Sequence, residues 1–242
     1  YADYTLWQHE LLGDESEKSS RSARELAYWK GALEGLPDVL ELPADRPRPA
    51  VASGRGASFS VEIPADVHAA MARIGKDHSA STFMVAHAAL SVVLSRLSAT
   101  EDIAVGTPVA GRSDQALDDL VGMFVNTLVL RAQVDPSASF AQLLSQVRST
   151  DLAAFSHAEV PFERLVDALS PVRSTAHSPL FQVALFFQNH AHAEFTLPDL
   201  TIATVPLMPD VSPFDLQVIL SNTEVTSGGD AGPITAQFNY AT

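Results

Sequence analysis

Apolar and polar positions follow two different periods along this chain. Over residues 57–63 they alternate, which predicts a strand with one covered face. Pro64 then suits the start of a helix, and apolar residues recur at helical spacing after it and again over 82–98. Longer apolar runs at 103–109 and 124–134 predict two further strands.

The second half of the chain continues this mixture of elements. Ser139 and Gln142 form a capping box at the start of an amphipathic segment, which predicts a helix that extends to Phe155. The nearly continuous apolar run at 181–187 is typical of a central strand covered on both faces. We therefore expect an α/β (α+β) fold, a two-layer sandwich in which helices cover a mixed sheet. Three further strand candidates complete the chain, at 196–205, 214–220 and 234–240.

The first part of the chain differs from this main body. Residues 8–38 are helix-forming, whereas residues 35–57 are rich in proline and glycine. Such a composition predicts an extended, solvent-facing connector. We therefore divide the chain into a leader with its Pro-rich connector, residues 1–56, and a main lobe, residues 57–242.

Composition excludes several classes of function. Lys and Arg total 15 against 29 Asp and Glu, a formal net charge of −14 that repels nucleic acid and anionic membranes. No apolar run approaches the ~20 residues of a membrane span. The chain has no cysteine, which removes disulfides and thiolate chemistry and fits a reducing compartment. We expect a cytoplasmic protein that binds neither nucleic acid nor membrane.

Common motifs of nucleotide binding and hydrolysis are absent, so the histidines remain as candidate chemical groups. His87 falls on the apolar stripe of its helix and is interpreted as a partly buried structural imidazole. His190 and His192 form a pair without a third ligand at a suitable spacing, and we expect no metal site. The three histidines expected to be solvated helix residues are His9, His68 and His78.

Several blocks of sequence are more specific than any single histidine. In chain order they are Tyr1-Ala-Asp-Tyr-x-x-Trp7, Gly106-Thr-Pro-Val-Ala-Gly-Arg112 with Val121-Gly-Met-Phe-Val-Asn-Thr-Leu-Val-Leu-Arg131, His157-Ala-Glu-Val-Pro-Phe-Glu163, Arg173-Ser-Thr-Ala-His-Ser-Pro-Leu-Phe-Gln-Val183, Phe214-Asp-Leu216 and Phe238-Asn-Tyr240. Together they resemble the third to the seventh core motifs of the condensation domain of nonribosomal peptide synthetases. The resemblance covers almost the whole chain, in the family's order.

One family motif is not in this sequence. The family's hallmark, His-His-x-x-x-Asp-Gly, lies upstream of the third motif, and no histidine here is followed by another. The resemblance therefore implies the C-terminal part of the domain, beginning after that hallmark and joined by its leader to a missing N-terminal lobe. It implies a chloramphenicol-acetyltransferase-like lobe with no catalytic residue of its own, inactive when isolated.

The resemblance also implies a reaction and partners. Condensation domains join a carrier-bound aminoacyl, peptidyl or acyl donor thioester to a carrier-bound aminoacyl acceptor by an amide bond. We expect carrier protein domains and an adjacent adenylation domain as partners. No cofactor is bound directly, because phosphopantetheine arrives on the carriers. Two alternatives remain: an epimerisation domain, and a stand-alone acyltransferase or binding module of the same fold.

Two sets of residues follow from the motif blocks and the strand ends. The candidates for the wall of the cleft, which a capping role would explain as well, are Asn126, Thr127, Gln188, Asn189, Ser212 and Asp215. The motif residues to which we assign a mainly structural role are Tyr1, Asp3, Trp7, Gly106, Arg112, Gly122, Phe124, Arg131, Pro161, Phe162, Glu163, Arg173, Pro179, Phe181 and Gln182.

Overall fold

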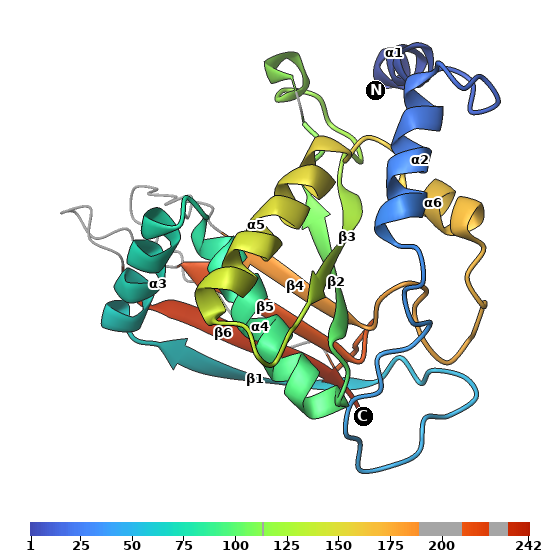
Figure 1. The fold of residues 1–242 in the computed structure, drawn as a ribbon. Helices are drawn as coiled ribbons and strands as arrows, with labels where there is room; N and C mark the ends of the chain where they lie inside the picture. Colours follow the sequence, from blue (N-terminus) through green and yellow to red (C-terminus); the bar gives the residue numbers. More distant parts are fainter. Residues whose placement is uncertain (113, 189–209, 223–231) are drawn as a thin grey trace, which may run out of the picture.

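A mixed sheet with helices packed against it forms the body of the protein (Figure 1). The computed structural model describes residues 1–112, 114–188, 210–222 and 232–242. Within these residues the strands are β1 (Gly56–Ile63), β2 (Asp102–Val109), β3 (Asn126–Gln133), β4 (Val183–Gln188), β5 (Leu216–Asn222) and β6 (Ile234–Ala241). The helices are α1 (Ala2–Leu12), α2 (Arg21–Ala32), α3 (Ala65–Asp77), α4 (Thr82–Ser98), α5 (Phe140–Ser156) and α6 (Phe162–Leu169), with a short 3₁₀ turn at Gln115–Leu117.

The strand order is β1-β6-β5-β4-β2-β3. Strand β4 pairs in parallel with both β2 and β5, and the other pairs are antiparallel. The prediction of a mixed sheet with 181–187 at its centre is therefore confirmed. Val183 and Leu185 are buried, as expected for a strand covered on both faces. Phe181 is also buried but lies just before β4, and Phe187, expected in the core as well, is only partly buried.

Two apolar clusters hold the layers together on opposite faces of the sheet. Val183 and Leu185 of β4 face the cluster under α4 and α5, whereas Ala184 between them faces a second cluster under α2 and α6. Trp29 of α2 and Leu165 of α6 are buried in that second cluster. Figure 1 shows α3, α4 and α5 over one part of the sheet and α2 beside α6 near β3.

The leader forms two helices, so the expectation of helix over 8–38 is wrong. Helix α1 begins at Ala2 and ends before Gly13, which has a φ of 69° that favours glycine. Helix α2 starts after Ser20, whose side-chain oxygen accepts a hydrogen bond from the Ala23 backbone N–H (3.0 Å). The polar segment 13–20 has no apolar face to bury, and the two helices meet there.

The Pro-rich segment 40–55 lies between α2 and β1, outside any helix or strand, and it is attached to the lobe at several points. Arg48 makes a two-pronged ion pair with Asp215, with distances of 2.8 and 2.5 Å. The Ala52 backbone N–H donates to the carbonyl of Thr175 (2.8 Å), and the Thr175 hydroxyl donates to the carbonyl of Ala50 (2.9 Å). The connector is therefore a strap along residues 174–176 and Asp215.

Three expectations change with the tertiary structure. Phe59 and Val61 lie on the predicted face of β1 but are half exposed, because β1 is the last strand in the sheet order. His68, expected in solvent, is buried, and its Nδ1 lies 2.7 Å from the carbonyl oxygen of Gly232. His87 is fully buried rather than partly so, with Nδ1 3.1 Å from both carboxylate oxygens of Asp151. The predicted strand 196–205 and the pair His190 and His192 lie outside the described residues.

Candidate functional site

Residues of the fourth and fifth family motifs meet at the carboxyl end of β2. Asn126 begins β3 opposite Val109 at the end of β2. Its side-chain nitrogen donates to the carbonyls of Ala158 (2.9 Å) and Val160 (2.8 Å), and its side-chain oxygen accepts from the backbone N–H of Phe162 (3.1 Å). The Asn126 amide thus bridges the sheet to the fifth motif and to the start of α6.

Replacement of Asn126 by alanine is expected to lower the free energy of unfolding by about 2–3 kcal/mol. Two carbonyls and one amide N–H, all in partly buried hydrogen bonds, lose their partner, and unpaired polar groups away from water are costly. Urea denaturation measures the loss. The matched control is Gln133→Ala at the exposed end of the same strand, for which a change below about 0.5 kcal/mol is expected. Equal losses of unfolding free energy in the two variants would show that Asn126 does not act as a bridge.

The third and fourth motifs pack directly on each other. A Cβ at Gly122 would come within 2.0 Å of the Tyr1 ring, so only glycine allows this approach. The Tyr1 hydroxyl donates to the carbonyl of Met123, and the Tyr1 and Phe124 rings meet at 5.3 Å. Arg112 places its guanidinium 4.1 Å from the centre of the Phe124 ring. We call α1 together with residues 110–112 and 114–125 the projecting arm.

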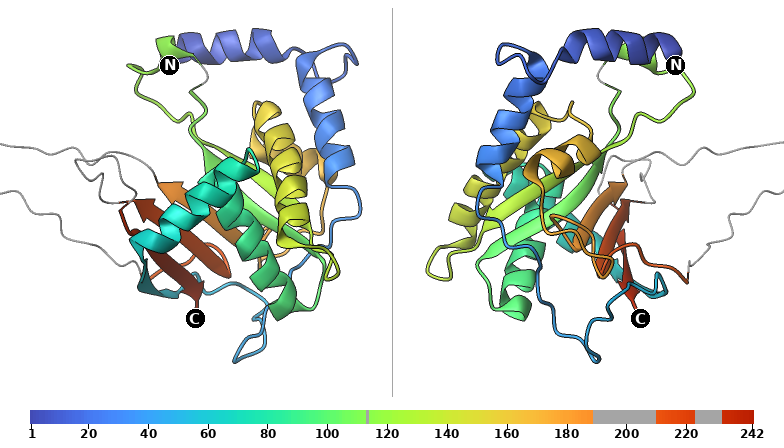
Figure 2. Two further views of the ribbon diagram at one scale, coloured as in Figure 1. Left: turned by 60° about the vertical axis from the view of Figure 1, so that its left-hand side comes forward. Right: turned by 90° about the vertical axis from the view of Figure 1, so that its right-hand side faces the viewer.

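The projecting arm extends beyond the sheet and carries apolar side chains without cover. Figure 2 shows α1 and the loop after β2 standing side by side away from the strands. Val121 is 94% exposed, and Leu6, Met123 and Val125 are also exposed. Of the first motif block, Trp7 is partly exposed against Tyr4 (5.9 Å), and Asp3 lies in the first turn of α1. An exposed apolar group of this extent is a typical interaction surface.

The sixth motif fastens the leader to the sheet. Gln182 is buried, and its side-chain oxygen accepts from the backbone N–H of Leu40 (2.7 Å) while its nitrogen donates to the carbonyls of Asp38 and Ser178. Next to it, Phe181 packs so closely on Gly106 that a Cβ there would lie 2.2 Å from the ring. Pro179 immediately precedes Leu180, a non-glycine residue with a φ of 67°.

Arg131 ties the end of α2 to the sheet edge. Its guanidinium binds both carboxylate oxygens of Asp102, at 2.8 and 2.7 Å. It also donates to the carbonyls of Ala32 (3.0 Å), the last residue of α2, and of Glu34 (2.9 Å), two residues after the helix. Hydrogen bonding to Asp102 raises the pKa of the Arg131 guanidinium further above its usual value. The Arg131 side chain therefore has a structural role, because its hydrogen bonds join α2 to the sheet.

The remaining motif residues lie around α6. Pro161 precedes the helix, and Glu163 lies in its first turn, where the helix dipole favours an acid. The Phe162 ring packs on Phe181 at 5.6 Å. Arg173 is exposed and pairs with Asp167 at 2.8 Å.

The six candidates for the cleft wall divide between the two ends of the strands. Parallel pairing places Asn126, Thr127 and Gln188 at the carboxyl end of β2 and β4. Asp215 lies at the opposite end, where its backbone N–H binds the carbonyl of Gln182 and its carboxylate binds Arg48. Ser212 is near it in the chain, and its hydroxyl donates to the carbonyl of Phe214 (2.6 Å). Asn189 lies outside the described residues.

Three aromatic rings at the carboxyl edge escaped the sequence analysis as a group. Phe83 at the start of α4 lies 6.0 Å from Phe155 at the end of α5 and 6.4 Å from Phe187 near the end of β4. Each was predicted on an apolar face of its own element. The strand order, which no local pattern contains, brings the three together.

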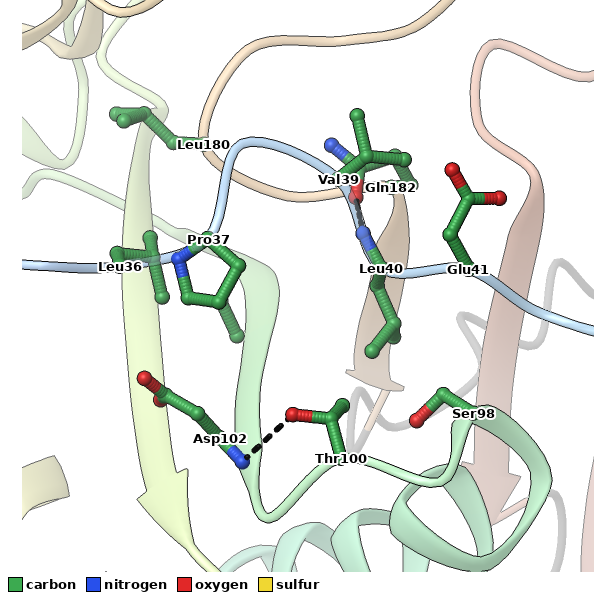
Figure 3. A pocket seen from close by; sticks show the side chains of 11 residues that line it. Leu36, Pro37, Val39, Leu40, Glu41, Ser98, Thr100, Asp102, Leu180 and Gln182 are labelled. Carbon is green, nitrogen blue, oxygen red and sulfur yellow. Dashed lines mark hydrogen bonds between the residues drawn. The ribbon is translucent and has the colours of Figure 1, made fainter.

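Two hollows of the described surface lie elsewhere. One, of about 250 Å³, separates leader residues 36–41 from the start of β2, with Gln182 in its wall (Figure 3). The other, of about 580 Å³, lies between the ends of α2 and α6. Neither lining includes a histidine, and neither hollow reaches the carboxyl edge at Asn126 and Gln188.

Within the described ranges, no group of three or more His, Cys, Asp or Glu side chains could hold a metal ion. In the same residues no single helix is long and apolar enough to cross a membrane. Helices α3 and α4 pass that test only as a pair bent by 103°.

Comparison with known proteins agrees with the motif geometry. The family profile described as "Condensation domain" matches residues 1–242. The chain is 49% identical over 242 residues to a "Probable non-canonical nonribosomal peptide synthetase" of Salinispora arenicola and 47% identical over 242 residues to the isonitrile lipopeptide synthase of Mycobacterium tuberculosis. It covers all of its own length in both, but only 3% and 10% of theirs.

Solved structures show the same fold. The X-domain from teicoplanin biosynthesis superimposes with a TM-score of 0.90 at 27% identity, over 99% of this chain and 54% of that one. A four-domain nonribosomal peptide synthetase, holo-AB3403, gives a TM-score of 0.78 at 27% identity, over 94% of this chain and 18% of that one. The fold is thus the chloramphenicol-acetyltransferase-like fold of condensation domains. The chain belongs to the condensation domain family of nonribosomal peptide synthetases.

Proposed function

We propose that this chain is the C-terminal lobe of a condensation domain that forms an amide bond together with a preceding lobe. This proposal rests on the share of each structure that the superposition covers. The chain aligns almost completely with the X-domain structure while spanning about half of it. The exposed apolar side chains of the projecting arm, Val121 and Met123 above all, supply a surface for the other half.

The proposed reaction joins two carrier-bound substrates in the cleft between the lobes. The acceptor amine attacks the carbonyl carbon of the donor thioester, so a C–N bond forms and the C–S bond breaks. The sulfur leaves as the thiol of the donor carrier, with the proton that the nitrogen loses. The phosphopantetheine arms are substrates held by the carriers, and the four-domain relative supports the proposal of carrier and adenylation partners.

This lobe contributes walls and orientation rather than a proton-transfer group. Thr127 and Gln188 at the carboxyl edge are the proposed lining residues, since the amide of Asn126 is bound to backbone. The hallmark histidine pair would come from the preceding lobe, so we propose that the isolated chain is inactive. A cytoplasmic location, where charged carriers and adenylated amino acids are available, is part of the same proposal.

A binding module of the same fold is the second candidate. The observation in its favour is the likeness to the X-domain, which has been solved in complex with OxyB and matches here with a TM-score of 0.89. The higher identity to synthetases, 49% and 47% against 26% for that complex, favours condensation. An amide-forming assay separates the two, because a binding module yields no product with any preceding lobe.

The arm supplies a direct test of the two-lobe arrangement. With the preceding lobe of the Mycobacterium tuberculosis relative supplied as a separate chain, Val121→Asp is expected to reduce amide formation about tenfold, the effect of ~1.4 kcal/mol at an interface. Mass spectrometry of the acceptor arm measures the product.

Val172→Asp is the matched control for that test. Val172 is 66% exposed but lies outside the arm, and its substitution should leave product formation unchanged. Equal rates of amide formation by the two variants would show that the arm is not part of the interface between the lobes.

A further inference from the structure

One histidine of the fifth motif contacts helix α2 at three residues, Glu25, Tyr28 and Trp29. Nδ1 of His157 lies 3.2 Å from a carboxylate oxygen of Glu25. The imidazole stacks on the Tyr28 ring, with 3.9 Å between centres and 13° between planes. The carbonyl of His157 accepts from the Trp29 indole N–H (2.9 Å). Three consecutive contacts along α2 therefore converge on one titratable residue.

The carboxylate of Glu25 depends on this histidine. Glu25 is only 5% exposed, and apart from their contact with each other its Oε2 and the Nδ1 of His157 have no hydrogen-bond partner in the described chain. Arg21, one turn earlier, is bound to Glu159 at 2.6 Å. A buried carboxylate without a cation is unfavourable, whereas a carboxylate beside an imidazolium is compensated.

Burial raises the pKa of the Glu25 carboxyl above its ordinary value. The charge of His157 and Arg21 acts in the opposite direction on that pKa, and Glu159 adds to the rise. Burial also raises the pKa of the Tyr28 hydroxyl, with Asp151 and Glu25 acting in the same sense. The charged and titratable groups around the contact are Arg21, Glu25 and Tyr28 from α2, His157 and Glu159 from the fifth motif, and Asp151 from α5.

We propose that Glu25 and His157 form a proton-linked clasp that holds α2 on the lobe while the pair carries a proton and releases it as the pH rises. The docked helix binds more protons than the released helix, so docking weakens with increasing pH. Because α2 leads back to α1 and the Tyr1–Gly122 contact, the clasp also controls how firmly the projecting arm is held. This inference concerns the leader and does not rest on the proposed reaction.

Hydrogen–deuterium exchange of α2 tests the clasp in the full chain. After correction for the intrinsic exchange rate, opening of the amides in residues 22–32 is expected to increase severalfold between pH 6 and pH 8, because the docked pair holds a proton that the released helix gives up. The amides of α5 serve as the reference, and their opening should change much less. A flat profile for α2, or an equal slope in α5, would overturn the proposal.

One substitution removes the charge of the pair, and a second one serves as its control. Glu25→Gln removes the charge at nearly constant volume and should abolish most of the pH slope in α2. Glu15→Gln is the control, because Glu15 also joins the leader to the lobe, through Arg164 at 2.9 Å, but involves no histidine. Its slope should equal that of the unmodified chain.

A third variant covers the case in which Glu25→Gln does not fold. His157→Asn removes the titratable ring and should flatten the profile in the same way. A pH slope retained in whichever of Glu25→Gln and His157→Asn folds would refute the clasp. If neither variant folds, the pH profile of hydrogen–deuterium exchange in the unmodified chain and the pH dependence of Trp29 fluorescence decide. In a Trp7→Phe background Trp29 is the sole indole, and emission that does not change between pH 6 and pH 8 counts against the proposal.

Discussion

Amide formation by this chain alone is expected to fall about 10²–10⁴-fold below that of a fusion with a preceding lobe. No histidine in the sequence is followed by a second one. Removal of a positioned acid–base group costs about that factor, and half of a cleft gives up orientation and water exclusion as well. The measurement is condensation of two loaded carrier proteins, followed by mass spectrometry of the acceptor arm.

The fusion partner is the preceding lobe of the Mycobacterium tuberculosis relative, which shares 47% identity with this chain in the matching half. The control is that relative's own pair of lobes, produced separately and then mixed, which shows whether lobes can reassociate at all. Turnover by the isolated chain at the rate of the fusion would place the chemistry in this lobe and refute the proposed division of roles.

Phe181→Ala is expected to lower the free energy of unfolding by about 3–5 kcal/mol, the range for a buried phenylalanine. The ring is 3% exposed and packs between Phe162 (5.6 Å) and Phe214 (5.4 Å). It also packs directly on Gly106, which has no side chain to fill the space that the ring would leave. The cavity should therefore persist rather than collapse.

Urea denaturation of Phe181→Ala beside Phe59→Ala measures this effect. Phe59 is 50% exposed on β1, the last strand of the sheet. Its replacement should lower the free energy of unfolding by less than about 1.5 kcal/mol, because half of its surface is already in water. Similar losses at the two positions would contradict the assignment of Phe181 to the core between the sheet, α2 and α6.

The elements that the sequence predicted well are those whose signals are local. Ser139 and Gln142 form the expected capping box, and α5 follows it. The run at 181–187 covers most of the central strand β4, because an apolar segment of that length is stable only when covered on both faces. The family motifs were equally readable, since their residues follow one another in the chain.

The predictions that were wrong depended on contacts between distant segments. His68 was expected in solvent because its own helix offers no reason to bury it, and the carbonyl of Gly232, 164 positions later, provides one. The division of the cleft candidates has the same origin. Gln188 and Asp215 both border strands, but the parallel pairing of β4 with β5 places them at opposite edges.

The Glu25–His157 contact also lay beyond sequence reasoning. Glu25 lies in a charged stretch of the leader and His157 in a motif more than a hundred positions later. Only the packing of α2 beside α6 places the two side chains together.

The way the leader is fastened bears on where synthetases can be recombined. By composition the Pro-rich connector resembles a linker, and it would be a natural crossover point for chimeric enzymes. Yet Gln182, Arg131 and the clasp hold the segment before it against the lobe, and Arg48 holds the connector itself. A junction within 40–55 would pair a foreign α2 with a native docking surface. Grafts that keep residues 1–56 with 57–242 preserve every one of these contacts.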